Sequence, residues 1–259
     1  MKIFDSHCHL DDGSYQKDLD SVVQRAGEAG IAAMMIVGIN ERRSAKALAI
    51  ANRYEGIYAS VGMHPHDAKA CDENQLRRLM SLAGDPKVRA WGETGLDFNR
   101  MFSPRADQEH WFVRQIQVAA DLDLPMIFHE RDSKGRFLEL LQRHWTPERR
   151  GVVHCFSGSP SELEAYLGLR LHIGITGILT TNQRGAKLRA MVRDIPDRSL
   201  LVETDAPYLT PTPERNKFRR NEPAFVRTVL LKLAAVRGQD PDELGRIIWN
   251  NTCRLYGVG

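Results

Sequence analysis

Histidines and carboxylates gather in short motifs that are spread over most of the chain. The side chains in these motifs that could bind a metal ion or react are His7, His9, His64, Glu93, His129, His154 and Asp205. Imidazole nitrogen favours zinc-like ions, whereas carboxylate oxygen also accepts harder ions such as Mg²⁺. The sequence therefore predicts a site for one or two divalent cations, provided that the fold brings these motifs together.

Arginines follow two of these motifs. Guanidinium groups match the oxygen atoms of phosphate, and the segment 208–223 also contains Tyr208 and Phe218, aromatic rings on which an unpaired base can stack. This segment contains Arg215, Arg219 and Arg220, which we expect to bind phosphate, and Arg131 stands two residues after His129.

Eight short apolar runs, rich in β-branched and aromatic residues, are the elements that must position these side chains. They are Lys2–Asp5, Met34–Val37, Ile57–Val61, Val88–Trp91, Met126–His129, Val152–Cys155, Leu171–Ile175 and Leu200–Glu203. Stretches of helix-forming composition separate them, which is typical of βαβ units and a parallel sheet. This alternation predicts an α/β fold, a (β/α)8 TIM barrel. A doubly wound open sheet is the alternative, but the glycine-rich phosphate loop that it usually has after its first strand is absent.

The polar motifs stand where these runs end. In a TIM barrel the carboxyl ends of all strands meet at one rim, which is where such enzymes have their active sites. Asp5, His7 and His9 follow one another at every second position, so the period of a strand predicts that all three lie on one face.

Helices complete the expected fold. Ser103 is the expected N-cap of a long helix, with Pro104 in its first turn. Two further helices are expected after the eighth strand, opened by Asn221 and by Asp240, and the last of them is an extra C-terminal helix. Because nothing in the sequence resembles a linker, residues 1–259 are predicted to form a single domain.

The composition excludes several classes of protein. The net charge of +3 is too small for a protein that coats nucleic acid, and 42% hydrophobic residues exclude disorder. The four cysteines stand singly, which indicates reduced thiols, and no apolar run is long enough to span a membrane. The polar N-terminus does not resemble a signal peptide, so we expect a cytoplasmic protein.

The ordered set of motifs resembles the TatD-related metal-dependent deoxyribonucleases, a branch of the amidohydrolase-like barrels. The matching motifs are Asp5-Ser-His7-Cys-His9, Gly62-Met-His64-Pro65, Gly92-Glu93-Thr-Gly95-Leu96-Asp97, His129-Glu-Arg131-Asp132, His154-Cys-Phe156-Ser-Gly158, Glu203-Thr-Asp205-Ala-Pro207-Tyr208 and Arg220-Asn221-Glu222-Pro223. The similarity extends from residue 3 to residue 223, and the segment 250–256 is also like the family. The loop 214–218 departs from the shorter turn that the family usually has, which bears on substrate preference.

The resemblance implies two metal ions and a phosphodiester substrate. His7, His9, Glu93 and Asp205 would bind one ion, and Glu93, His129 and His154 would bind the other, with Glu93 bridging. His64 and Arg131 would lie near the scissile phosphate. Zn²⁺, Mg²⁺, Mn²⁺, Co²⁺ and Ni²⁺ all suit such ligands. The expected substrate is DNA, either a single strand or a strand end, and the expected activity is that of an exonuclease. We expect the protein to bind neither a membrane nor an obligate protein partner.

The expected mechanism uses the ions to activate water and to neutralise charge on the phosphate. Asp205 would orient the attacking water or accept its proton. Glu93 would hold both ions, and His64 would stabilise phosphate charge together with the arginines.

Three other functions stay open. One is an amide, ester or lactone hydrolase of the amidohydrolase type, but many such enzymes bridge two ions with a carboxylated lysine where this chain has Glu93. The second is an aminoacyl-tRNA deacylase on the same barrel. The third is a catalytically silent barrel that binds nucleic acid, which would predict loss of ligands, whereas all six expected ligands are present.

Overall fold

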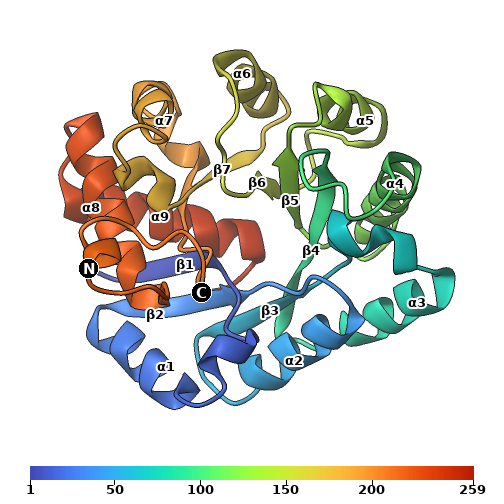
Figure 1. Ribbon diagram of the computed structural model, residues 1–259, viewed down its shortest axis with the longest axis horizontal. Helices are drawn as coiled ribbons and strands as arrows, with labels where there is room; N and C mark the ends of the chain where they lie inside the picture. The colour runs from blue at the N-terminus through green and yellow to red at the C-terminus, as the bar shows by residue number, and fades with distance from the viewer.

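Eight parallel strands follow one another around a barrel in the order of the sequence, from β1 to β8 (Figure 1). The computed structural model describes all 259 residues. The strands are β1 Ile3–Cys8, β2 Ile31–Ile36, β3 Ile57–Val61, β4 Val88–Asp97, β5 Met126–Arg131, β6 Gly151–Val153, β7 His172–Ile175 and β8 Leu200–Val202. The barrel closes where β1 meets the segment after β8: Cys8 pairs with Ala206, and the His9 amide donates to the Ala206 carbonyl over 2.7 Å. The predicted (β/α)8 barrel is confirmed.

Helices surround the barrel and cover its outer face (Figure 1). They are α1 Leu19–Glu28, α2 Glu41–Ala51, α3 Glu73–Leu82, α4 Arg105–Asp121, α5 Arg136–His144, α6 Pro160–Gly168, α7 Ala186–Met191, α8 Val226–Arg237 and α9 Pro241–Tyr256. None of them is both long and apolar enough to cross a membrane. The larger of the two apolar clusters, with 54 buried residues, is built from these helices and the outward-facing strand residues.

The extra C-terminal helix α9 packs against the start of the barrel. Asp240 accepts a hydrogen bond from the Glu243 amide over 2.9 Å, so it caps this helix as expected. At the other end of α9, Leu255 and Tyr256 belong to the second apolar cluster together with inward-facing strand residues such as Phe4. The Tyr256 hydroxyl donates to the Ser6 carbonyl over 3.0 Å. The interior is therefore apolar near α9, and polar side chains are left to the carboxyl ends of the strands.

Strand β4 is longer than the sequence predicts, since it continues past Trp91 to Asp97 and contains the motif that was expected to follow it. Two glycines allow its close pairing with β5. A Cβ atom on Gly92 would lie 2.4 Å from the Ile127 carbonyl oxygen, and one on Gly95 would lie 1.9 Å from the His129 carbonyl oxygen. Both residues also have positive φ angles, of 139° and 152°. Only glycine fits at these positions, and Glu93 lies between them.

Two of the expected helix caps are wrong. Helix α4 begins at Arg105, and Ser103 instead accepts from the Lys69 amide and donates to the His66 carbonyl. Asn221 is buried five residues before Val226, where α8 begins, and its side-chain amide donates to the Thr204 and Tyr208 carbonyls. Both polar side chains form hydrogen bonds with backbone groups of neighbouring loops and not with the first turn of a helix. These partners are distant in the sequence, so the local sequence could not predict them.

Candidate metal centre

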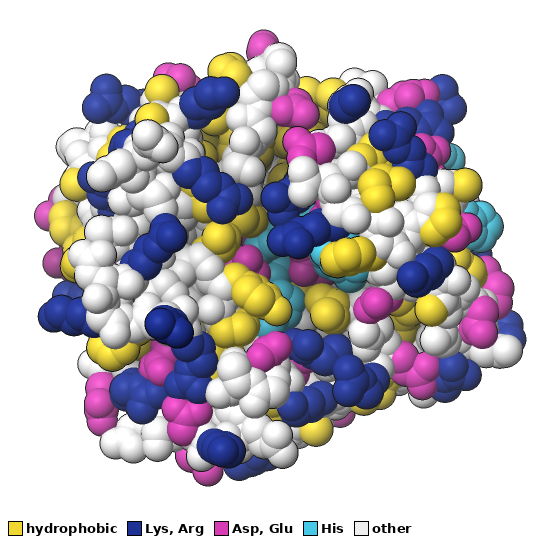
Figure 2. Space-filling model, in the orientation of Figure 1, with side chains coloured by type: hydrophobic (Ala, Val, Ile, Leu, Met, Phe, Trp, Pro, Cys, Tyr) yellow, Lys and Arg dark blue, Asp and Glu magenta, His cyan; other side chains and the backbone are white.

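The seven residues singled out in the sequence meet at the carboxyl ends of the strands. His7 belongs to β1, Glu93 to β4 and His129 to β5, and the others stand in the first residues after their strands. All except His7 line one hollow of about 590 Å³, and His7 is completely buried beside it. Figure 2 shows this hollow near the centre of one face, with histidines on its floor and Lys or Arg side chains around it. The predicted convergence of the motifs is confirmed.

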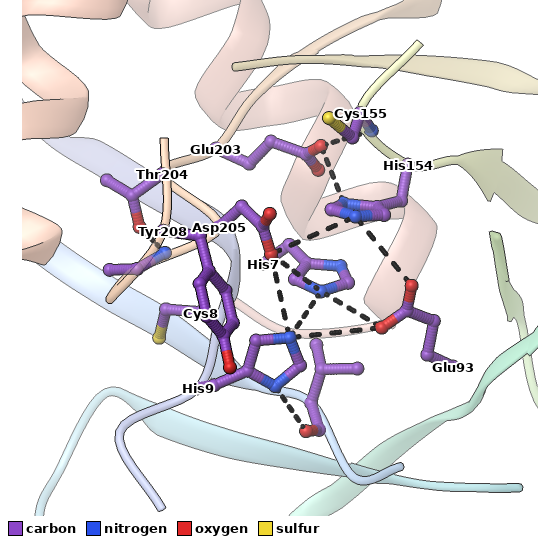
Figure 3. Close-up of polar contacts among 12 residues, drawn as sticks. His7, Cys8, His9, Glu93, His154, Cys155, Glu203, Thr204, Asp205 and Tyr208 are labelled. Carbon is purple, nitrogen blue, oxygen red and sulfur yellow. Dashed lines mark hydrogen bonds and ion pairs between the residues drawn. The ribbon is translucent and has the colours of Figure 1, made fainter. Parts of the chain in front are cut away.

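One group of donor atoms lies between β1 and the end of β8 (Figure 3). The Nε2 atoms of His7 and His9 are 3.3 Å apart. They lie 3.5 and 3.8 Å from Glu93 Oε2, and 3.8 and 3.6 Å from Asp205 Oδ1. The ring of His154 stacks on that of His7 at 3.6 Å, with its Nε2 atom 3.9 Å from Asp205 Oδ1. These five side chains direct their donor atoms to one place.

A second group surrounds the other oxygen of Glu93. His129 Nδ1 lies 2.8 Å from Glu93 Oε1, His64 Nε2 lies 3.6 Å from it and His154 Nε2 lies 3.7 Å from it. Glu93 thus presents Oε2 to one set of imidazoles and Oε1 to another. His64, which was expected beside the phosphate, is as close to Glu93 as the expected ligand His154.

The donor set fits divalent cations. The four expected imidazole ligands and two carboxylates are buried except for the partly buried His129 and Asp205. The donor atoms lie within 4.8 Å of one another in three triads: His7, His9 and Glu93; His7, His154 and Asp205; and His64, Glu93 and His129. The facing Nε2 atoms of His7 and His9 place two ring nitrogens beside two carboxylates, where a cation would satisfy all four groups.

The charges of these groups are strongly coupled. Burial opposes ionisation of Glu93, but the charge of His154 and the hydrogen bond with His129 outweigh it and hold the pKa of Glu93 well below the usual range. Burial also opposes the charge of His129, yet its hydrogen bonds to Asp97 and Glu93 raise its pKa to about 9. For His64 burial dominates and lowers the pKa well below its ordinary value. The carboxylates are therefore ionised, and cationic partners balance them.

Outer partners orient the ligands. His9 Nδ1 lies 3.0 Å from the Val37 carbonyl, so that this nitrogen donates and Nε2 is left with a lone pair for a cation. His154 Nδ1 lies 2.8 Å from Glu203 Oε1, and the same oxygen accepts from the Cys155 amide over 2.6 Å. Glu203 had no role in the sequence interpretation. Its position two residues before Asp205 was the signal that could have indicated one.

Asp5 does not join the histidines, contrary to the expectation from strand alternation. The pairing of β1 with β2 shifts its register between Asp5 and Cys8, which breaks the period of two. The Asp5 carboxylate accepts from the Thr204 hydroxyl over 2.6 Å and from the Thr204 amide over 2.9 Å. Burial raises its pKa to about 8. Asp5 therefore anchors the segment that carries Asp205.

The arginines divide into free and paired groups. Arg131 lines the hollow of the metal centre, as does Arg100, which the sequence interpretation missed, and neither has a carboxylate within 4.0 Å. Arg215 and Arg219 line a second cavity nearby. Arg220 lies 2.6 Å from Asp18 and 2.9 Å from Glu222, so its guanidinium already has two acidic partners.

The amino-acid sequence is similar to those of known proteins over nearly its whole length. The sequence profile of the family described as TatD related DNase matches residues 4–257. The chain is 42% identical over 257 residues to the "3'-5' ssDNA/RNA exonuclease TatD" of Cronobacter sakazakii, which covers 98% of this chain and 97% of that protein. It is 40% identical over 260 residues to the protein of that name from Escherichia coli K12, covering 99% of each.

A solved structure agrees with these sequence matches. The crystal structure of YjjV, a TatD homologue from Escherichia coli K12, superimposes with a TM-score of 0.90 at 31% identity, covering 99% of this chain and 98% of that one. Because the family profile and these relatives span nearly the whole chain, the protein belongs to the TatD-related DNase family.

Proposed function

We propose that the protein is a 3′–5′ exonuclease that hydrolyses single-stranded DNA or RNA with two divalent cations. The observation that carries the proposal is the position of Glu93 between two groups of histidines. Its Oε2 atom faces His7, and its Oε1 atom faces His129. The names of the relatives at about 40% identity support the direction and the substrate. The hydrolysis of a phosphodiester suits such a centre because an anionic group must be attacked by a weak nucleophile.

The residues present can hold two ions that share Glu93. His7, His9 and Asp205 would complete one site, and His129 with His154 would complete the other. Bound divalent cations supply Lewis-acid polarisation and lower the pKa of water.

The chain's own side chains then have distinct roles. Asp205 is an ionised carboxylate at the edge of the hollow, placed to accept a proton from the attacking water. Arg131 and Arg100 line the same hollow, where they would neutralise phosphate oxygens, and His64, which burial keeps neutral, would donate a hydrogen bond to phosphate from its Nε2 atom. Arg215 and Arg219 would bind phosphates farther along the strand. Phosphate binding by Arg220 stays a prediction, and so do the cytoplasmic location of the protein and the lack of an obligate protein partner.

The direct test is a time course on a single-stranded oligonucleotide labelled at its 5′ end. The protein is stripped of metal with a chelator and then supplied separately with Mg²⁺, Mn²⁺, Zn²⁺, Co²⁺ or Ni²⁺. We expect a ladder that shortens from the 3′ end and needs added metal. Glu93→Gln should lower the rate at least about a hundredfold, with Glu164→Gln on the exposed face of α6 as the control.

The same preparation tests the other functions. Turnover of lactones or cyclic amides without cleavage of the oligonucleotide would favour the amidohydrolase activity. Release of an amino acid from aminoacyl-tRNA with an intact RNA chain would favour a deacylase. Binding of the oligonucleotide without turnover in any metal would indicate a silent barrel.

A further inference from the structure

A second cavity of about 550 Å³ adjoins the metal centre. It lies between the loop after β7 and the segment after β8, and its walls include Ile178, Arg184, Tyr208, Arg215, Phe218 and Arg219. Tyr208 lines this cavity and also the hollow of the metal centre, and its ring lies edge-on to that of His9 at 6.2 Å. Figure 3 shows the Tyr208 ring directed toward His9. Only the Tyr208 side chain would therefore separate a molecule in the second cavity from the expected ligand His9.

The charge of this cavity is entirely positive. Arg184, Arg215 and Arg219 line it, and no acidic residue does. None of the three forms an ion pair, although Arg220, which follows directly in the sequence, is held by Asp18 and Glu222. Three guanidinium groups without acidic partners around one concave surface attract an anion, and their planar donors suit phosphate.

Two exposed aromatic rings line the same cavity. Tyr208 is 54% exposed and Phe218 is 50% exposed, and both belong to the few large apolar side chains of this chain that face solvent. The Phe218 ring packs on that of Phe225 with the centroids 5.5 Å apart. Phe218 is thus supported from behind, and its exposed part is available to a planar ligand. Rings of this kind stack on unpaired bases without regard to sequence.

We propose that this cavity binds the nucleotide that flanks the scissile phosphate on one side, with its base against Phe218 and Tyr208 and its phosphate on the arginines. The inference deepens the proposed exonuclease function and rests on it. A volume of about 550 Å³ is within the range of sites for small ligands, which suits a single nucleotide. A base in this position cannot remain paired, so the cavity would select single strands over duplexes.

The first test combines variants of Phe218 with oligonucleotides that lack one base. An abasic residue is placed at the 3′-terminal or at the penultimate position, and KM and kcat are measured for each. With the wild-type protein, one of these two substrates should show a KM raised about tenfold. Phe218→Leu should raise KM for the intact oligonucleotide by the same factor and abolish the difference between intact and abasic substrates. Phe218→Tyr, which keeps the ring, should restore wild-type behaviour.

The second test removes charge. Arg215→Gln together with Arg219→Gln should reduce the slope of log affinity against log salt by about 0.7 for each phosphate that these arginines neutralise in the wild-type protein. The matched control is Arg198→Gln together with Arg254→Gln, which removes the same charge at another cavity lined by arginines. If the slope of log affinity against log salt changed equally in both double variants, the salt dependence would come from the overall positive charge of the protein and not from this cavity.

The outcomes separate this inference from the proposed function. If the wild-type protein cleaves the intact oligonucleotide but Phe218→Leu keeps the full abasic effect, the cavity is not the base site. If the wild-type protein cleaves nothing, the exonuclease function fails, and fluorescence anisotropy of the labelled oligonucleotide in chelator still tests the cavity. An unchanged dissociation constant for Phe218→Leu in that assay would overturn the inference.

Discussion

At the scale of residues, the site depends on carboxylates that face histidines from opposite sides. Glu93 faces His7 Nε2 and His129 Nδ1 on the inner side, and Glu203 faces His154 Nδ1 on the outer side. A ligand histidine whose second nitrogen faces a carboxylate is fixed in its orientation and becomes more basic. Glu203, which lies behind His154, should therefore contribute to metal affinity without touching the ion.

Glu203→Gln tests this positioning role. The amide keeps the volume but removes the charge beside His154 Nδ1, so we expect metal affinity to fall by about 10- to 100-fold. Because the metal site itself is intact, raising the metal concentration should restore much of the nuclease rate. Metal titration of activity, with circular dichroism as the check on folding, measures both effects. A rate that stays low at saturating metal would contradict a role through affinity.

At the scale of elements, β4 is the strand that most constrains the centre. It carries Glu93 between two glycines whose missing Cβ atoms allow β5 to approach. Strand β5 in turn carries His129, so the spacing of these two strands sets the distance between Glu93 Oε1 and His129 Nδ1, which is 2.8 Å.

Gly95→Ala should disturb this spacing. Its Cβ atom would lie 1.9 Å from the His129 carbonyl oxygen, and we expect a loss of about 3 kcal/mol in the free energy of unfolding, measured by urea denaturation. Gly27→Ala in α1 is the matched control, because nothing lies within 4 Å of its added methyl group and alanine favours helix, so the protein should gain up to about 1 kcal/mol. Equal stability of the two variants would refute the close approach.

At the scale of the whole molecule, the metal centre joins elements from both ends of the chain. His7 lies in β1 and Asp205 follows β8, next to the place where the barrel closes through Cys8 and Ala206. Ligands that bind only the folded protein stabilise it by mass action. Ions held at this seam should therefore stabilise the entire barrel as well as activate water.

Metal removal tests this coupling. At a metal concentration of about one hundred times Kd, binding contributes about 2.7 kcal/mol, so a chelator should lower Tm by about 5–10 °C for a chain of this size. Differential scanning calorimetry measures the change. A variant that carries His7→Asn and His9→Asn should show a much smaller response to the chelator, and a response as large as that of the wild-type protein would contradict the assignment of these ligands.

A histidine far from the centre makes the stability of the fold depend on pH. Burial, together with the charge of Arg254, lowers the pKa of His172 below its ordinary value of 6.5. The unfolded chain then binds a proton more readily than the folded one, so this residue destabilises the protein as the pH falls through about 6.5.

His172→Asn should remove this contribution. Asparagine can still donate to the Gly151 carbonyl, which His172 Nδ1 reaches over 3.3 Å. Urea denaturation at about pH 7.5 and about pH 5.5 should show a smaller loss of stability in the variant than in the wild-type protein. The exposed His144→Asn serves as control. A loss in His172→Asn equal to that of the wild type would rule out this contribution.

The sequence alone determined the fold class and the expected ligands. Eight apolar runs with polar residues at their ends predict a parallel sheet with a polar edge, because parallel strands all present their carboxyl ends to the same side, and the absence of a glycine-rich phosphate loop favours the barrel over an open sheet. What local sequence could not decide depends on contacts between distant segments. The register shift in β1 directs Asp5 to Thr204 and not to the histidines, and the carboxylates beside Arg220 distinguish it from Arg215 and Arg219. Such differences arise only when segments about 200 residues apart are packed together, since charge pairing and strand register are properties of the tertiary structure.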